Sequence, residues 1–444
     1  MALVKKLNYV EDVYDITVED NHNFYGNGIL VHNCVEIGKY PFDPETGKSG
    51  WQACNLTEIN GAKVTSLDAL LEAVRAATII GTLQAGYTHF PYLDEISKKI
   101  VEREALLGVS ITGWMNNPQV LFDPENLKQA ALLAKEVNKE VAELIGINQA
   151  ARITTTKPSG NASVLLGTAS GIHAEHSPRY LRHVQMNKEM EVAQLIKKTN
   201  PYMVEDSIWS SNNTDYMLAF PVIAPETSIF KENMLGVNLL EKVKLAQQNW
   251  IEYGTNVELC VDPRLRHNIS NTITVPDDKW DEVEEYVFTN RQYFAGISFL
   301  SVSGDRDYYQ APFTAVRTPE EIVEEYGSAG IFAAGLVTDA LKVFSNLWRA
   351  IDVARDTSLS SNQDRLDTQA DWIRRFHKFA HNYFDGDIQR AGYCLKDVAI
   401  LHKWEKIQQN YQDVEFSSQL MAKKYTDVDT LTGAACAGGS CELF

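Results

Sequence analysis

The sequence has few cysteines, a deficit of positive charge and no long apolar run, and each shortage excludes a class of protein. Six cysteines in 444 residues are too few for a secreted scaffold held together by disulfide bonds. A formal net charge of −18 argues against general binding to the phosphate backbone of nucleic acids. No apolar run approaches the ~18 residues of a membrane span, and the first residues lack the apolar core of a secretory signal. We therefore expect a cytoplasmic protein with neither a nucleic-acid nor a membrane partner.

Helical patterns recur through the long central region. Apolar residues on one face predict a helix around residues 67–77 and a second helix over residues 126–145. Gly146 follows the second helix in the position of a C-cap. Thr318, followed by a proline and by Glu321, has the pattern of a capping box and predicts the start of another helix.

Strand-like runs lie between these helices. Alternation over residues 269–275, a helical pattern over 280–287 and a short apolar run over 297–301 follow one another. This strand–helix–strand order predicts α/β structure with parallel strands in a domain that extends from residue 34 to about 424. From residue 425 to 444 the chain becomes small and polar, which is typical of a flexible tail.

Residues 1–33 differ from the rest of the chain in their pattern of apolar and turn-forming residues. Short alternating segments and turn-forming residues predict a small all-β unit, which at this length cannot bury a core of its own. The unit ends in His32-Asn33, followed by Cys34. Asn33 can attack its own carbonyl group and cut the bond to Cys34, whose thiol can accept an acyl chain, while His32 protonates the scissile amide. As an isolated tripeptide, these residues have a simpler explanation as a chance part of a hairpin.

The longer stretch around this tripeptide resembles the C-terminal signature of inteins. The resemblance covers residues 13–19 and 22–34 and implies that Asp15 and His22 assist the proton transfers of splicing. The first half of an intein is absent. We therefore predict the C-terminal fragment of a split intein of the Hint type, whose N-terminal half arrives on another chain. The alternative is a sequence that has been truncated at its beginning.

Two cysteines near this junction have potential chemistry of their own. Cys34 is followed two residues later by Glu36, and side chains at this spacing in an extended loop point to the same side. A thiol and a carboxylate could thus meet one substrate, although Cys-x-Glu alone is a common pattern. Cys54 precedes Asn55-Leu56 and, taken alone, has its plainest explanation as a buried structural cysteine.

A turn and a pair of thiols are further candidate sites. Residues 158–160 form a Pro-Ser-Gly turn whose consecutive N–H groups and hydroxyls could cradle an anion, or which could be an ordinary turn. Cys436 and Cys441 flank two glycines near the end of the sequence, which suits a mobile dithiol. The alternative for this pair is half of a zinc site. Cys260 and Cys394 lie in apolar or helical contexts and are expected to be structural.

The chain resembles the C-terminal half of ribonucleotide reductases. The resemblance rests on four features in the same order along the chain: Cys34 with Glu36, Cys54, the turn at residues 158–160, and Cys436 with Cys441. The resemblance implies that Cys34 becomes a thiyl radical and that Glu36 acts as general base. It implies that Cys54 is one of two reducing thiols, whose partner lies in the absent N-terminal half. Cys436 and Cys441 would then re-reduce the resulting disulfide.

The resemblance also implies the fold and a phosphate site. The fold would be the C-terminal half of the family's ten-stranded α/β barrel. The substrate phosphates would be bound by Pro158, Ser159, Gly160, Asn161 and Ser163. The family often has threonine where Asn161 stands, which leaves that contact open.

Residues 266–274, 296–301 and 395–404 look most like the adenosylcobalamin-dependent (class II) reductases. The resemblance thus implies a ribonucleoside-triphosphate reductase with adenosylcobalamin as its cofactor. An alternative is a large-subunit fragment of a di-iron-dependent (class I) ribonucleoside-diphosphate reductase. That class carries a tyrosine pair on the strand where Leu300-Ser301 stands here, whereas Tyr308-Tyr309 follows later. A third alternative is a degenerate fragment that acts only as a binding or structural subunit.

Several partners are implied by the two resemblances. They are an N-terminal reductase chain carrying the other intein half, thioredoxin or a similar dithiol reductant, a ribonucleotide substrate, and a nucleotide effector bound mainly by the absent half. Cys34 would act first in splicing and later in hydrogen abstraction. The unspliced chain is therefore expected to be inactive as a reductase.

Overall fold

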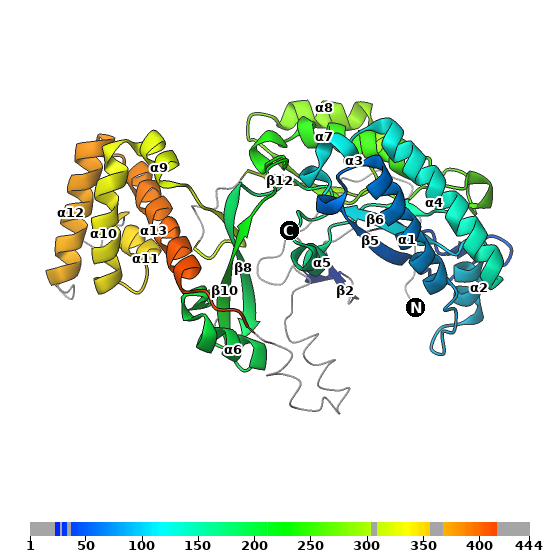
Figure 1. The fold of residues 1–444 in the computed structure, drawn as a ribbon, viewed down its shortest axis with the longest axis horizontal. Coiled ribbons are helices and arrows are strands. Elements are labelled where there is room, and N and C mark those ends of the chain that lie inside the picture. The colour runs from blue at the N-terminus through cyan, green and yellow to red at the C-terminus, as the bar shows by residue number, and fades with distance from the viewer. Residues whose placement is uncertain are drawn as a thin grey trace.

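The computed structural model describes residues 23–26, 29–32, 37–210, 212–302, 309–355 and 367–414. These residues form a parallel sheet covered by helices, a four-stranded antiparallel sheet and a bundle of helices (Figure 1). Near the N-terminus, β1 (Asn23–Gly26) and β2 (Ile29–His32) pair as antiparallel strands, as expected for β structure within residues 1–33.

The parallel sheet is built in two parts. The strands β5 (Asn55–Asn60), β6 (Leu107–Thr112) and β7 (Thr154–Thr155) form one part. The strands β11 (Asn271–Val275) and β12 (Ile297–Ser301) form the other and pair in parallel, as the sequence predicted. A parallel bridge between Thr156 and Ile269 joins the parts. The three strands and the two strands thus follow one another in the order β5-β6-β7-β11-β12.

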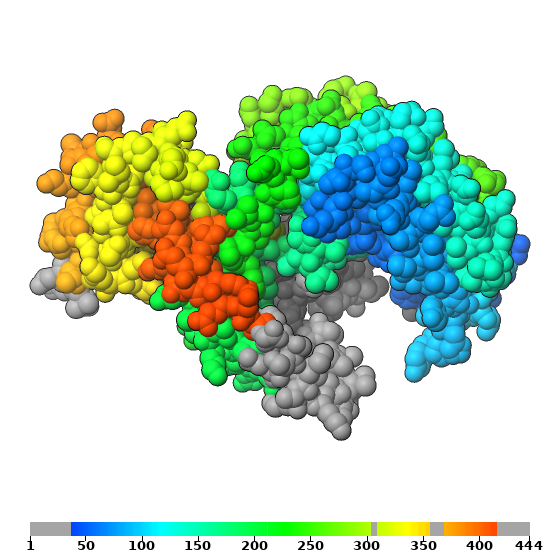
Figure 2. All heavy atoms as spheres, in the orientation of Figure 1, coloured from blue at the N-terminus to red at the C-terminus, as the bar shows by residue number. Residues whose placement is uncertain are grey.

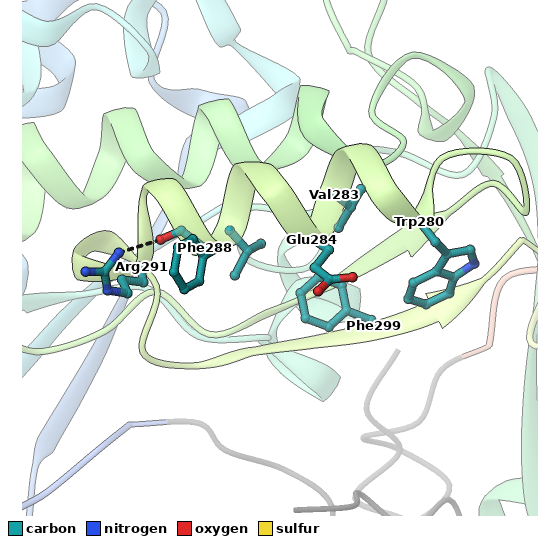
Figure 3. A pocket seen from close by; sticks show the side chains of 7 residues that line it. Trp280, Val283, Glu284, Phe288, Arg291 and Phe299 are labelled. Atoms are coloured by element: carbon teal, nitrogen blue, oxygen red, sulfur yellow. Dashed lines mark hydrogen bonds between the residues drawn. The ribbon is translucent and has the colours of Figure 1, made fainter. Parts of the chain in front are cut away.

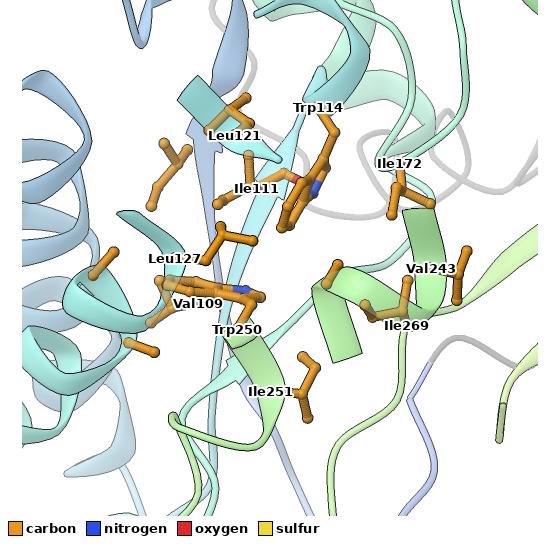
Figure 4. Close-up of a cluster of buried hydrophobic side chains, with 14 of the residues drawn as sticks. Val109, Ile111, Trp114, Leu121, Leu127, Ile172, Val243, Trp250, Ile251 and Ile269 are labelled. Carbon is orange, nitrogen blue, oxygen red and sulfur yellow. The ribbon is translucent and has the colours of Figure 1, made fainter. Parts of the chain in front are cut away.

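Helices cover one face of this sheet. They include α1 (Leu67–Ala85), α4 (Pro124–Ile145), α7 (Val237–Ala246) and α8 (Trp280–Thr289). Figure 4 shows side chains of β6, of these helices and of the segment Gln247–Ile251 after α7 packed together in the core, among them the buried Val109, Ile111, Leu127, Val243 and Trp250. Burial of such side chains is the main stabilising contribution to this part of the fold.

The ends of α4 follow the local signals in the sequence. The side chain of Asp123 accepts hydrogen bonds from the N–H groups of Glu125 and Asn126, and Pro124 occupies the first helical position. Gly146 ends the helix in a left-handed conformation with φ of 75°. The helix predicted over 126–145 is thus confirmed.

The antiparallel sheet has the order β13-β8-β10-β9. Its longest strands, β8 (Arg179–Asn187) and β10 (Asp215–Ile223), pair along their whole length, with β13 (Phe313–Ala315) and β9 (Val204–Asp206) at the edges. The sheet lies between the parallel sheet and the helical bundle (Figure 1).

The bundle has a hydrophobic core of its own. It consists of α9 (Pro319–Tyr326), α10 (Ser328–Val343), α11 (Leu347–Arg355), α12 (Asp367–Phe384) and α13 (Ile388–Asn410). The predicted capping box of Thr318 and Glu321 starts α9. In the space-filling view, the bundle and the helices of the parallel sheet lie at opposite ends of the molecule (Figure 2). The sequence had not separated this bundle from the domain that begins at residue 34.

The shorter elements complete the described chain. They are β3 (Phe42–Asp43), β4 (Lys48–Ser49), α2 (Glu95–Glu104), α3 (Pro118–Leu121), α5 (Gly160–Leu166) and α6 (Glu191–Thr199). No single helix in the described ranges is long and apolar enough to cross a membrane, and only the bent pair of α10 and α11 together reaches that length and composition.

Candidate functional site

The second face of the parallel sheet is polar. Ile59, Val109 and Ile111 point into the core beneath the helices, so the residues between them on β5 and β6 face the other side. In the register of the sheet, Glu58 stands opposite Ser110, and Ser110 stands opposite Thr155. The residues of this polar face are Leu56, Glu58 and Asn60 from β5, Gly108, Ser110 and Thr112 from β6, Thr155 from β7, Thr272 and Thr274 from β11, and Ser298 from β12.

An ion pair crosses the polar face. The Lys157 Nζ atom lies 3.0 Å from Glu58 Oε1, and both side chains are largely buried. The same ammonium group donates a hydrogen bond of 3.1 Å to the carbonyl oxygen of Pro158. Between the two ends of the pair, on β6, the Ser110 hydroxyl is fully buried and has no hydrogen-bond partner among the described residues. Buried polar atoms in folded proteins nearly always have a hydrogen-bond partner, so this hydroxyl is available to a water molecule, an ion or a ligand.

The turn over residues 158–160 is fixed to the end of β6. The Thr112 hydroxyl donates to the carbonyl oxygen of Ala169 and accepts from the N–H of Gly171. The Ser159 hydroxyl is hydrogen-bonded to the same Thr112 oxygen. Since the one proton of Thr112 goes to Ala169, Ser159 must be the donor in this contact. The hydroxyl of Ser159 is thus turned into the protein.

The start of α5 shows what an anion would meet at this turn. Gly160 has φ of 27°, which a residue with a side chain rarely adopts. Ser163 donates its hydroxyl to the carbonyl oxygen of Gly160, and Ser159 makes no side-chain cap with the helix. Asn161 lies in the first turn of α5. An anion here would therefore contact backbone N–H groups rather than the hydroxyls of Ser159 and Ser163.

Cys54 lies at the other end of the polar face. It directly precedes β5, and its spacing from Leu56 and Glu58 places it on their side of the sheet. Burial raises the pKa of the Cys54 thiol to about 12, while the positive charges of Lys39 and Arg152 act in the opposite direction. The thiol is therefore protonated at neutral pH. A protonated thiol can give up hydrogen and become oxidised to a disulfide, but it is a poor nucleophile.

The structure thus brings two of the predicted sites to one face. Cys54 lies beside Gly108 near the start of β6 and the turn lies at the end of β6, and the four residue steps from Gly108 to Thr112 span about 13 Å in a strand. His32 ends β2 and pairs with Asn23. The other predicted site residues lie outside the described ranges, namely Asp15, His22, Asn33, Cys34, Glu36, Cys436 and Cys441. Cys394 is buried in α13 and Cys260 is partly buried, which agrees with their structural interpretation.

Sequence reasoning did not single out Glu58, Gly108 or Thr112 on the polar face, or Lys157 beside it. Only Gly108 carried a local signal, because an isolated glycine within a strand often marks a close approach of other atoms. The partners of the other three lie far away in the sequence, so no local pattern pointed to them.

A groove on the helical side of the sheet is separate from these sites. It has a volume of about 500 Å³ and lies between α8 and β12 (Figure 3). Its lining is mostly apolar, with Trp280, Phe288 and Phe299 among the residues. Arg291 at one end donates to the carbonyl oxygen of Phe288. None of the predicted site residues lines this groove.

Comparison with known proteins gives partial similarities. No family model matches the chain. It is 22% identical over 289 residues to an adenosylcobalamin-dependent ribonucleoside-triphosphate reductase of Lactobacillus acidophilus, a match that covers 59% of this chain and 37% of that protein. The corresponding enzyme of Lactobacillus leichmannii is 26% identical over 236 residues, covering 46% and 30% of the two chains. That of Euglena gracilis is 24% identical over 237 residues, covering 51% and 30%.

These matches are similarities to part of each relative. The chain spans about a third of the length of the curated relatives that it matches, with 37% of the L. acidophilus protein covered. Among solved structures, a B12-dependent (class II) ribonucleotide reductase matches with a TM-score of 0.49 and 18% identity, over 61% of this chain and 39% of that one.

Proposed function

We propose that this chain is the C-terminal part of an adenosylcobalamin-dependent ribonucleotide reductase. Joined to the remainder of the protein, it would reduce ribonucleoside triphosphates to deoxyribonucleotides for DNA synthesis. One observation carries the proposal: a protonated thiol, Cys54, shares the polar face of a parallel sheet with the turn at Pro158–Gly160. The relatives named above are reductases of this kind and supply the reaction that such a face would serve.

In this proposal each residue has one task. Cys54 and a second thiol supply two hydrogen atoms and become a disulfide, while the ribose loses its 2′-hydroxyl as water. The backbone N–H groups at the start of α5 bind the substrate phosphates. Cys34 abstracts a hydrogen atom from the ribose and Glu36 accepts a proton from its hydroxyl. Cys436 and Cys441 then reduce the disulfide, and thioredoxin or a similar dithiol reduces them.

The cofactor belongs to the completed protein. Adenosylcobalamin, when bound, supplies the radical that the thiol of Cys34 receives. Within the described residues, no group of three or more His, Cys, Asp or Glu side chains is placed to hold a metal ion. The described residues account instead for the reducing thiol and for substrate orientation.

The succession of strands supports a place for the chain in a barrel. The strands β5-β6-β7-β11-β12 are all parallel, and the helices α1, α4, α7 and α8 cover one face. Such a layer would form half of a ten-stranded α/β barrel, with the polar face turned inward. The other half, and most of the effector site, would come from the N-terminal reductase chain.

The test of this function uses the joined protein, made either by splicing or as one continuous gene. We expect deoxyribonucleotide formation from a ribonucleoside triphosphate only when adenosylcobalamin is present, and loss of at least ~1000-fold in kcat for Cys54→Ser. Product formation without cobalamin but with a di-iron subunit would establish the class I alternative instead. Full activity of Cys34→Ser would show that the chain is only a structural subunit.

We further propose that residues 1–33 join the two halves by protein trans-splicing. The hairpin of β1 and β2 supports this, because it brings His32 to the end of a strand immediately before Asn33 and Cys34. Mixing this chain with an N-terminal chain that carries the other intein half should yield a ligated product without residues 1–33, seen by intact-mass measurement. Asn33→Ala should stop ligation. Ligation that survives this substitution would contradict the splicing proposal.

A further inference from the structure

Gly108 lies directly beneath the sulfur atom of Cys54. A Cβ atom added at Gly108 would stand 2.9 Å from Cys54 Sγ and 2.5 Å from Leu56 Cδ2. It would also stand 3.4 Å from Thr155 Cγ2 on the neighbouring strand. Contacts under about 3 Å are shorter than van der Waals distances, so a side chain at this position would have to displace its neighbours. The missing side chain of Gly108 thus creates a niche on the polar face, which the ends of the Leu56 and Cys54 side chains occupy.

The backbone at this position gives no other reason for glycine. Gly108 lies within β6, where it pairs in register with Leu56, and it is not among the residues with positive φ. Glycine in the interior of a strand weakens the strand, because it has more conformational freedom to lose and no side chain to pack. The flanking residues Leu107 and Val109 are fully buried apolar side chains. Space for other atoms is therefore the physical reason for glycine here.

We propose that Gly108 is a positioning residue for Cys54. Its bare Cα atom sets how deeply the thiol sits in the polar face of the sheet, and any side chain at position 108 lifts the sulfur out of the niche. That the position of the thiol matters for ribonucleotide reduction rests on the proposed function. The niche itself does not rest on it, because it follows from the distances around Gly108.

The protonation of the thiol is consistent with this niche. Burial is the largest cause that raises the pKa of Cys54 to about 12. A sulfur lifted out of the niche would lose part of this burial, and its pKa would fall toward the ordinary value near 9 for cysteine. The thiolate is the form that reacts with alkylating agents, so its rate of alkylation reports the position of the sulfur.

The experiment compares Gly108→Ala with a matched control in the full chain. Gly81→Ala is the control, because its added Cβ atom would meet Leu107 and Thr57 on the helical side of the same strands at an ordinary 3.7 Å. Each protein is treated with iodoacetamide at pH 8, and the modification of Cys54 is followed by peptide mass spectrometry. We expect alkylation of Cys54 to be about tenfold faster in Gly108→Ala and unchanged within twofold in Gly81→Ala. A rate in Gly108→Ala within twofold of the native chain, or slower, would overturn the proposal.

A second variant distinguishes the contact with the sulfur from the destabilisation that the contact with Leu56 causes. Gly108→Ala also crowds Leu56, so Gly108→Ala with Leu56→Ala removes that contact and leaves the contact with the sulfur. The double variant should regain stability toward urea yet keep the fast alkylation of Cys54. If the double variant were alkylated at the native rate, contact with Leu56, and not with the sulfur, would be the reason that position 108 requires glycine.

The joined reductase provides the functional readout. There, Gly108→Ala should lower kcat at least tenfold and leave KM for the ribonucleotide within twofold, because the phosphate turn at the far end of β6 is untouched. A larger KM with native kcat would contradict a positioning role. If the native joined protein formed no deoxyribonucleotide, the proposed function would fail, whereas the alkylation rates would still decide whether Gly108 positions Cys54.

Discussion

The ammonium group of Lys157 meets the carboxylate of Glu58 across an intervening strand. The two atoms are 3.0 Å apart, although Glu58 lies on β5 and Lys157 follows β7, with β6 between them. The pair ties the strand that carries Cys54 to the residues just before the turn at Pro158. It therefore joins β5 to the segment after β7 across the polar face of β6.

Breaking this ion pair should destabilise the chain. Glu58 and Lys157 are both largely buried, so removing one charge takes from the other its partner in this ion pair. We expect Glu58→Gln and Lys157→Met each to lower the free energy of unfolding by about 2 kcal/mol. The double variant should lose clearly less than the sum, since both members of the ion pair are removed together. Additive losses in urea unfolding would show that the two groups are not coupled.

Thr112 should be needed for the shape of the phosphate turn. Its hydroxyl is hydrogen-bonded to Ser159, Ala169 and Gly171, all in or near the turn. Thr112→Val has nearly the same shape but leaves these buried groups unpaired, so we expect a loss of about 2–3 kcal/mol. Thr112→Ser keeps the hydroxyl and should lose about 1 kcal/mol or less. Equal losses for both variants in thermal unfolding would mean that the methyl group, and not the hydroxyl, matters.

The alkylation of Cys54 should depend on pH in an unusual range. With its pKa raised to about 12, the thiol is almost wholly protonated up to pH 10. The rate of reaction with iodoacetamide should thus rise about tenfold per pH unit from pH 8 to 10 without levelling off. Because the folded pKa exceeds the unfolded one, this group stabilises the fold below about pH 9, and the contribution is lost as pH rises further. A plateau in rate below pH 9 would contradict the burial of the thiol.

His267 should make the fold sensitive to acid. The residue is fully buried, and burial together with the charge of Arg152 lowers its pKa to about 3, with a smaller effect from Lys39. The unfolded chain therefore takes up a proton near pH 6.5 that the folded chain refuses, and stability falls as pH drops below that value. We expect a loss of about 2–3 kcal/mol between pH 6.5 and pH 4.

The contribution of His267 can be isolated by substitution. His267→Asn keeps an amide donor near the carbonyl oxygen of Thr154, which the histidine Nδ1 contacts now. This variant should show a weaker loss of stability in acid than the native chain. His381→Asn, at an exposed position of α12, is the control and should leave the loss unchanged. An unchanged pH dependence in His267→Asn would assign the acid sensitivity to other groups.

The sequence was sufficient for elements whose limits depend on nearby residues. The end of α4 was predicted from Gly146, whereas its start lies two residues before the predicted residue 126, at Pro124 after the N-cap Asp123. The capping box at Thr318 likewise marks the start of α9. The order of strand, helix and strand over residues 269–301 was enough to predict parallel pairing, because a parallel connection needs a crossover of this length.

Long-range packing could not be predicted in the same way. The helices of the bundle have the same apolar periodicity as those that cover the sheet, and periodicity shows that a helix has a partner without showing which one. The separate core of α10, α12 and α13 was therefore missed. The pairing of Lys157 with Glu58 depends on the order of strands in the sheet, which the sequence of each strand does not specify.

The redox state of Cys54 during turnover tests the central claim most directly. The joined protein is incubated with adenosylcobalamin and a ribonucleoside triphosphate, but without an external dithiol, then denatured and alkylated. Peptide mass spectrometry gives the fraction of Cys54 that is still a thiol. The protein used carries serine in place of Cys436 and Cys441. If Cys54 reduces the ribose, the fraction of Cys54 that is still a thiol should fall in step with the deoxyribonucleotide formed. If deoxyribonucleotide forms while all of Cys54 is recovered as the alkylated thiol, that result contradicts the account.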